Sequence, residues 1–254
     1  MASEVACLKP HSESVACCCF TPHLGSVLAS GSHDNSVMLW RVDDGWTIRL
    51  LGHTNWVTCV ASQPHGALLA TGSADETVRL WDVGGLIGAP DGTEVKESDA
   101  VLKNYGGCIK CCAWSEGGEL LCIGSTDNVL RVWRVTRTGC DLVNVLRGHK
   151  GWVLCCSFSP TDETLAASGS SDGSVRLWRV DTGETVTKLT PDKKKGFRGA
   201  SAPEVQCCCF HPGGELLCTG GDDKRVRLWR VSDGACVRVL QGHKGCVNGC
   251  SFQR

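Results

Sequence analysis

The sequence has 254 residues, a formal charge of −1 and 42% hydrophobic residues, enough to bury one sizeable core. A charge so close to zero gives the molecule no general attraction to nucleic acid or to an anionic membrane, so any such binding would be local. Residues 1–14 lack the order of a secretory signal and no apolar run is long enough to span a bilayer, so we expect a cytoplasmic protein, with the nucleus as the alternative.

The nineteen cysteines favour reduced thiols over a disulfide scaffold. Their number is odd and many are adjacent, as in Cys17 to Cys19, and neighbours on a strand point to opposite faces. We therefore expect buried structural thiols in a reducing compartment. Zinc at Cys108 and Cys111 is the alternative, but that pair lacks a second ligand pair, so we predict no metal and no cofactor.

Five segments, taken in chain order, end in one pattern, in which a turn containing aspartate leads into a strand that closes on tryptophan. They are GSHDNSVMLW at Trp40, GSADETVRLW at Trp81, GSTDNVLRVW at Trp133, GSSDGSVRLW at Trp178 and GGDDKRVRLW at Trp229. An apolar stretch such as VLCCSFSP precedes each segment, and a strand such as ETVTKL follows it. Each unit therefore predicts four short strands joined by turns, and the lack of helical periodicity excludes a helical solenoid.

Glycine-histidine pairs before three first strands make the pattern more specific: Gly52-His53, Gly148-His149 and Gly242-His243. Together with five tryptophans in phase, they make nearly the whole chain resemble the WD-repeat (WD40-type) β-propeller family. The doubled cysteines also resemble those of WD-repeat, SAM and U-box proteins. The resemblance implies an all-β propeller of four-stranded antiparallel blades, five complete and a sixth partial, in a single domain. The repeats fall at about 9–51, 52–103, 104–147, 148–190, 201–241 and 242–254.

The two ends of the chain bear on how such a ring would close. Residues 4–8 are placed to form the outer strand of the last blade, and 246–252 to form one inner strand of a sixth. Since a half-built blade leaves an open edge, we expect a chain truncated at its C-terminal end, from a longer protein of six or seven blades. A closed ring that tolerates an incomplete blade is the alternative.

The family resemblance also implies a buried His, Ser/Thr, Asp and Trp set in each blade. Three sets are complete: His11, Ser30, Asp34 and Trp40; His53, Thr71, Asp75 and Trp81; and His149, Ser168, Asp172 and Trp178. Two are partial: Asp127 and Trp133, with Tyr105 and Ile123 at the other places, and Thr219, Asp223 and Trp229, with Ser201 replacing histidine. Because the set repeats and includes tryptophan, a structural role is favoured over a hydrolase triad. No GxSxG, GKS/T or HExxH motif occurs, so we predict no catalytic residue and no enzyme.

Partners of this family usually dock on the face whose loops enter the innermost strands. By matched position, that face carries Ser14, His33, Thr54, Trp56, Lys150, Trp152, Ser171, Glu204 and Asp222. Trp56 and Trp152 are the expected anchors, because exposed aromatic side chains are typical interface hot spots. The alternative is that they pack on neighbouring loops. The predicted function is a non-catalytic scaffold that binds other proteins in a complex.

Two insertions interrupt the repeat. Residues 84–100 are Gly-rich and polar and predict a flexible surface loop. Residues 191–203 carry a basic patch, Lys193, Lys194, Lys195 and Arg198. That patch could bind phosphate on RNA or a phosphoinositide, which is one alternative function. A substrate-recognition module of a ubiquitin ligase is another, although Trp81-Asp82 lacks the arginine two residues later that many such receptors carry.

Overall fold

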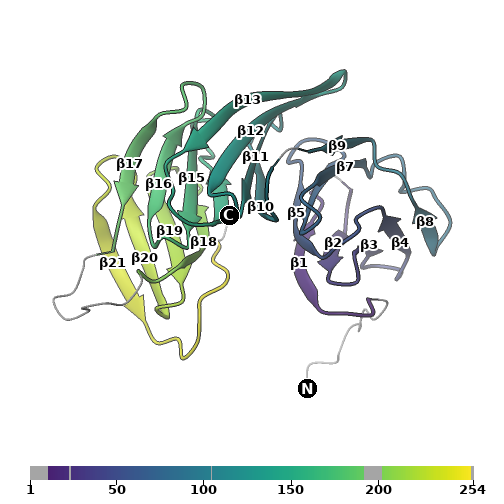
Figure 1. The fold of residues 1–254 in the computed structure, drawn as a ribbon. Helices are drawn as coiled ribbons and strands as arrows, with labels where there is room; N and C mark the ends of the chain where they lie inside the picture. Colours follow the sequence, from purple (N-terminus) through teal and green to yellow (C-terminus); the bar gives the residue numbers. More distant parts are fainter. Residues whose placement is uncertain (1–10, 23, 104, 192–201, 253–254) are drawn as a thin grey trace.

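The structure is a computed structural model that describes residues 11–22, 24–103, 105–191 and 202–252. All regular secondary structure in these ranges is β-strand, and no helix capable of crossing a membrane occurs among them. The strands form five sheets, each containing a four-stranded antiparallel blade, and Figure 1 shows the blades standing side by side. This arrangement confirms the predicted fold class.

Each blade uses four strands, almost all consecutive in the chain. Blade 1 contains β1 (Val15–Phe20), β2 (Val27–Ser32), β3 (Ser36–Arg41) and β4 (Thr47–Leu51). Blade 2 contains β5 (Val57–Ser62), β6 (Leu68–Ser73), β7 (Val78–Asp82) and β9 (Ala100–Leu102). Blade 3 contains β10 (Ile109–Trp114), β11 (Leu120–Ser125), β12 (Val129–Thr136) and β13 (Gly139–Arg147). Blade 4 contains β14 (Val153–Phe158), β15 (Leu165–Ser170), β16 (Val175–Arg179) and β17 (Thr185–Leu189). Blade 5 contains β18 (Val205–Phe210), β19 (Leu216–Gly221), β20 (Arg225–Arg230) and β21 (Cys236–Gln241).

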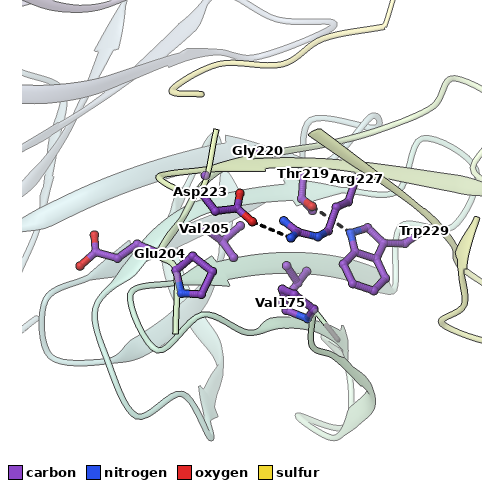
Figure 2. A pocket seen from close by; sticks show the side chains of 11 residues that line it. Val175, Glu204, Val205, Thr219, Gly220, Asp223, Arg227 and Trp229 are labelled. Carbon is purple, nitrogen blue, oxygen red and sulfur yellow. Dashed lines mark hydrogen bonds and ion pairs between the residues drawn. The ribbon is translucent and has the colours of Figure 1, made fainter. Parts of the chain in front are cut away.

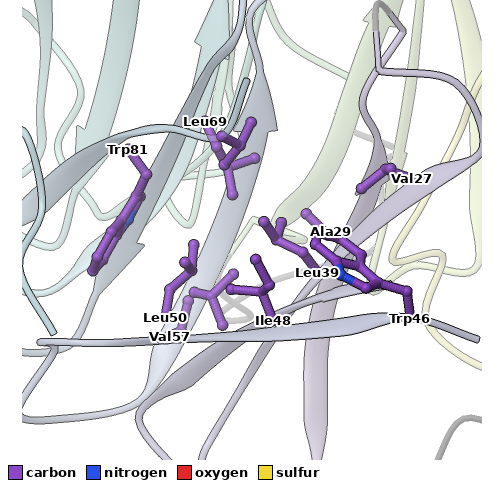
Figure 3. Packing of buried hydrophobic residues seen from close by; sticks show 11 residues of the cluster. Val27, Ala29, Leu39, Trp46, Ile48, Leu50, Val57, Leu69 and Trp81 are labelled. Carbon is purple, nitrogen blue, oxygen red and sulfur yellow. The ribbon is translucent and has the colours of Figure 1, made fainter. Parts of the chain in front are cut away.

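Apolar side chains from neighbouring blades merge into shared clusters. Between blades 1 and 2, Leu39 and Ile48 lie in one cluster with Val57, Leu69 and Trp81, all almost fully buried (Figure 3). Each blade therefore buries its apolar face only by packing against the next one, which is the rule for repeat architectures.

A glycine in the second strand of every blade sets how closely the next blade approaches. A Cβ atom added at Gly31 would lie 2.6 Å from Val57 Cγ1, and one added at Gly124 would lie 2.6 Å from Val153 Cγ1. Real Cβ atoms essentially never approach so closely, so these positions accept no larger side chain without a shift of the neighbour. The first residue of each of the inner strands β5, β10, β14 and β18 thus rests on the glycine of the preceding blade.

The inner strands pack in the order β1, β5, β10, β14 and β18, and within the described residues no packing of similar extent joins β18 to β1. Val15 and Phe20 of β1 are accordingly 55% and 62% exposed, whereas the matching Val57 and Phe158 are 0% and 6% exposed. The described blades therefore form an open arc.

The segment 246–252 lies against blade 5 in the position of a further inner strand. Val247 N donates to Gly221 O (3.0 Å), and a Cβ added at Gly220 would lie 2.5 Å from Val247 Cγ1. This segment forms no strand, because every other inner strand pairs with the second strand of its own blade and the described residues contain no such partner for this one. The outer strand expected at residues 4–8 lies outside the described residues.

The insertion after blade 2's third strand is ordered, which corrects the prediction of a flexible loop. Its β8 (Thr93–Val95) pairs in parallel with β4 and so adds a fifth strand to blade 1. Trp46 Nε1 donates to Ala89 O (2.8 Å) and Arg41 donates to Ile87 O (2.9 Å). The prediction was wrong because this pairing joins residues more than forty positions apart and leaves no periodic signal in the insertion itself.

Candidate partner-binding face

A buried hydrogen-bond chain fastens the loop before the inner strand to the rest of its blade. In blade 2, Trp81 Nε1 donates to Thr71 Oγ1 (2.9 Å), which lies 2.8 Å from His53 Nε2, while His53 Nδ1 lies 2.8 Å from Asp75. Because a carboxylate only accepts, Nδ1 carries the proton and the Thr71 hydroxyl donates to Nε2. Asp75 also accepts the Thr54 backbone N–H (3.0 Å), so the chain holds the loop that begins the predicted face.

Blades 1 and 4 contain the same chain, formed by His11, Ser30, Asp34 and Trp40, and by His149, Ser168, Asp172 and Trp178. Asp34, Asp75 and Asp172 are the network aspartates. Burial raises the pKa of each carboxyl group, but hydrogen bonds from the histidine, from a nearby backbone N–H and from the hydroxyl two residues later outweigh burial. The pKa of each network aspartate therefore lies well below its usual range, and the carboxyl groups are ionised at neutral pH.

In blades 3 and 5, an ion pair between an arginine and the aspartate replaces part of the hydrogen-bond chain. Arg131 donates to Asp127 (2.6 Å) and Arg227 donates to Asp223 (2.5 Å), each arginine lying four residues after its aspartate. The sequence reasoning missed these two arginines, although an arginine at this spacing also occurs in blades 2 and 4 and could have served as the signal.

Blade 3 is the least satisfied of the five. Ile123 occupies the place of the hydroxyl residue, and both the Tyr105 hydroxyl and Trp133 Nε1 are buried without a hydrogen-bond partner. In blade 5, Trp229 Nε1 still donates to Thr219 (2.8 Å), and Ser201 lies outside the described residues. Figure 2 shows a small pocket beside Thr219, Asp223, Arg227 and Trp229.

Two tryptophans stand out on the predicted face. Trp56 and Trp152 precede the inner strands of blades 2 and 4 and are 53% and 51% exposed. Trp56 stacks on His33 of blade 1, with ring centres 4.5 Å apart and planes 19° apart, and Lys110 Nζ of blade 3 lies 5.9 Å from the centre of the Trp152 ring. Each ring therefore contacts the preceding blade and leaves about half of its surface to solvent.

Backbone hydrogen bonds place the two loops of each blade at the same end. Trp56 O accepts from Ala74 N (2.9 Å), and Trp152 O accepts from Ser171 N (2.9 Å). The same bond recurs between Ser14 and His33 and between Glu204 and Asp222. The residues predicted for the face thus lie on matched loops, of which Ser14, Thr54, Lys150 and Asp222 are exposed and His33, Ser171 and Glu204 are partly buried.

Two other predicted sites fare differently. The basic residues Lys193, Lys194, Lys195 and Arg198 lie outside the described residues. Cys108 Sγ lies 3.6 Å from Ala74 O of blade 2, whereas Cys111 Sγ lies 3.9 Å from Val153 O of blade 4. These two thiols point toward opposite neighbouring blades, so the structure does not bring them together as a zinc pair.

Comparison with known proteins agrees with the repeat. Residues 2–41, 45–82, 97–134, 140–179 and 192–230 match a family model described as WD domain, G-beta repeat, which covers well over half of the chain. The Periodic tryptophan protein 2 homolog of Schizosaccharomyces pombe is 30% identical over 57% of this chain and 16% of its own length. The Angio-associated migratory cell protein of Homo sapiens is 26% identical over 91% of this chain and 48% of its own length. The Guanine nucleotide-binding protein subunit beta of Oryza sativa subsp. japonica is 27% identical over 57% and 39%. The chain thus spans less than half of the length of these relatives.

Proposed function

The chain belongs to the WD-repeat family, and from this premise we propose that it is a non-catalytic platform that binds partner proteins on the face bearing Trp56 and Trp152. The observation that carries the proposal is the matched pair of half-exposed tryptophans on alternate blades. Large aromatic side chains that are held in place but remain accessible supply most of the energy at many interfaces. Because rigid blades hold both rings, little conformational freedom is lost when a partner docks.

The buried networks support a non-catalytic role. The side chains of the three network histidines are only 1–5% exposed, and each hydroxyl already accepts a hydrogen bond from tryptophan. A catalytic nucleophile must reach its substrate, so these groups are better suited to holding the blade together.

Membership of a multiprotein complex is part of the proposal. One relative is named as a subunit of a guanine nucleotide-binding protein, which is a name for a component of an assembly. A cytoplasmic or nuclear location belongs to the same proposal and is supported by the free thiols of the described cysteines.

The test is quantitative affinity capture from an extract of the source cells with wild-type chain, a Trp56→Ala/Trp152→Ala variant and a Leu142→Ala/Val186→Ala control. The control also removes two half-exposed apolar side chains, 46% and 51% exposed, but from the outer strands β13 and β17. Loss of a hot spot of about 2 kcal/mol weakens binding roughly thirty-fold, so partners held by wild type and control should be largely absent from the tryptophan variant.

Either of two results would count against the proposal. If the tryptophan variant and the control capture the same proteins equally well, the binding face is wrongly assigned. If the wild-type chain enriches no protein over an unrelated propeller, the scaffold function itself fails.

A further inference from the structure

Each interface between blades contains four matched positions that face one another. Two lie on the inner strand, one on the second strand beside them, and one on the inner strand that follows. Between blade 5 and the segment 246–252 all four are cysteine: Cys207, Cys209, Cys218 and Cys250. The matched sets at the other interfaces are Cys17, Cys19, Ala29 and Val60; Cys59, Ala61, Ala70 and Cys112; Cys111, Ala113, Cys122 and Cys156; and Cys155, Ser157, Ala167 and Cys208. A full set of thiols therefore occurs at one described interface.

The thiols of this interface converge. The sulfurs of Cys209, Cys218 and Cys250 all lie within 4.8 Å of one another, and Cys209 Sγ lies 3.5 Å from Cys250 Sγ. Cys207 lies two residues before Cys209 on the same strand, and its thiol donates to Val247 O (3.5 Å) beside the three clustered sulfurs. Cys218 is buried and Cys209 and Cys250 are partly buried, so most of the cluster is screened from solvent while an ion can still reach it.

We propose that Cys209, Cys218 and Cys250 bind one zinc ion, and that Cys207, on the same face of β18 as Cys209, turns its thiol from Val247 O toward the ion as the fourth ligand. Zinc bound tetrahedrally by thiolates has Zn–S distances of about 2.3 Å, which places the sulfurs roughly 3.8 Å apart. The three sulfurs reach that spacing with shifts of less than about 1 Å, which side-chain rotation supplies. Soft thiolate ligands in tetrahedral geometry favour zinc over magnesium or calcium.

Zinc at this place would strengthen the attachment of a segment that rests on blade 5 through the buried side chain of Val247 and the contact between the Phe252 and His211 rings. The segment 246–252 forms no strand, and Val247 supplies its backbone hydrogen bond to blade 5. The free energy of zinc binding would then stabilise the last interface directly, since the unfolded chain offers no preformed site. The site is independent of the partner-binding face, and its presence would overturn the sequence-based prediction of no metal.

The test compares four chains of all 254 residues, each purified anaerobically with a non-chelating reductant, supplied with zinc and freed of excess ion. Zinc content is measured by mass spectrometry of the metal, and affinity by competition with a chromogenic chelator. The chain itself provides compatible replacements: Cys218→Ala, because alanine occupies that position at three other interfaces, and Cys250→Val, because Val60 occupies the matched position. Cys208→Val is the control. Cys208 is the residue matched to Cys250 at the interface between blades 4 and 5, where Ser157 and Ala167 stand in place of two of the four cysteines.

Wild type and Cys208→Val should bind about one zinc ion per chain, and the other two variants should bind at least roughly a hundred-fold more weakly, since even outer-shell changes cost tenfold to a hundred-fold. Zinc should also slow amide hydrogen exchange in residues 246–252 of wild type, and nearly as much in Cys208→Val. It should leave exchange unchanged in Cys218→Ala. Equal zinc binding by all four chains, or no zinc in wild type, would overturn the proposal. A Cys209–Cys250 disulfide that persists in reductant would overturn it as well.

Discussion

Replacing Thr71 with valine isolates the contribution of one buried hydrogen-bond chain. Valine has nearly the same shape as threonine, so Thr71→Val leaves no cavity, but it removes the oxygen that accepts from Trp81 Nε1 at 2.9 Å and contacts His53 Nε2 at 2.8 Å. Thr71 and Trp81 are 0% and 1% exposed, so water cannot replace the lost partner. An unsatisfied buried polar group costs about 1–3 kcal/mol, and two are created here.

The added methyl group recovers up to about 0.8 kcal/mol of burial, so we expect Thr71→Val to lower the free energy of unfolding by about 1–5 kcal/mol. Ile123→Val is the matched control, because Ile123 occupies the same position in blade 3, where no hydroxyl bonds the tryptophan. Its cost should be about 0.5–1.5 kcal/mol, the usual value for removing one methylene.

The assay is urea unfolding followed by tryptophan fluorescence and circular dichroism, with Trp81→Phe completing a double-mutant cycle. Since phenylalanine brings no N–H, the Thr71→Val/Trp81→Phe chain should be more stable than additivity predicts by at least about 1 kcal/mol. Additive effects, or a cost of Thr71→Val no larger than that of Ile123→Val, would refute the view that this chain of bonds stabilises the blade.

Three further outcomes follow from the packing and the charges. The folded pKa of each network aspartate lies below the unfolded value of about 3.9, so the stability that these groups add is present above that pH and is lost as the pH falls. The urea midpoint should therefore drop between about pH 5 and pH 2. A midpoint that is unchanged at about pH 3 would contradict this. Phe20→Ala, at a site 62% exposed, should change stability by less than about 0.5 kcal/mol, whereas Phe158→Ala, at the matching site 6% exposed, should cost about 3–4 kcal/mol in the same unfolding assay. Gly124→Ala should lower the thermal midpoint and cost about 1–3 kcal/mol, because its Cβ would lie 2.6 Å from Val153 Cγ1, and an unchanged midpoint would show that the blades can separate freely.

Local pattern accounts for what the sequence predicted about the fold. Strands, hairpins and the position of each aspartate turn repeat within a few residues of one another, so one unit explains the next. The residue after each aspartate has positive φ, as in Asn35 (67°) and Lys224 (65°), and asparagine tolerates that conformation better than most residues.

Contacts between distant segments account for what the sequence did not predict. β8 reaches β4 across a whole blade, and Cys250 meets Cys218 only because the last segment lies against blade 5. An arginine lies four residues after the aspartate in blades 2 to 5, but it donates to that aspartate in blades 3 and 5, where the histidine is replaced, so the repeated position alone does not predict the pairing. The exposed halves of Trp56 and Trp152 likewise depend on how neighbouring blades sit beside each other.

The absence of extensive β18 to β1 packing within the described residues changes how this molecule should lose its structure. Blades that each touch only the one before and the one after behave as a linear lattice, whose stability is a sum of per-unit terms and nearest-neighbour couplings. In such a lattice, opening of this 254-residue chain begins at a terminal unit and moves inward one coupling at a time, so blades 1 and 5 should exchange their amide protons before blades 2 and 4. A weakened coupling between blades 2 and 3 would then divide the arc into two independently melting halves, whereas the same change in a closed circle would leave a second route of support.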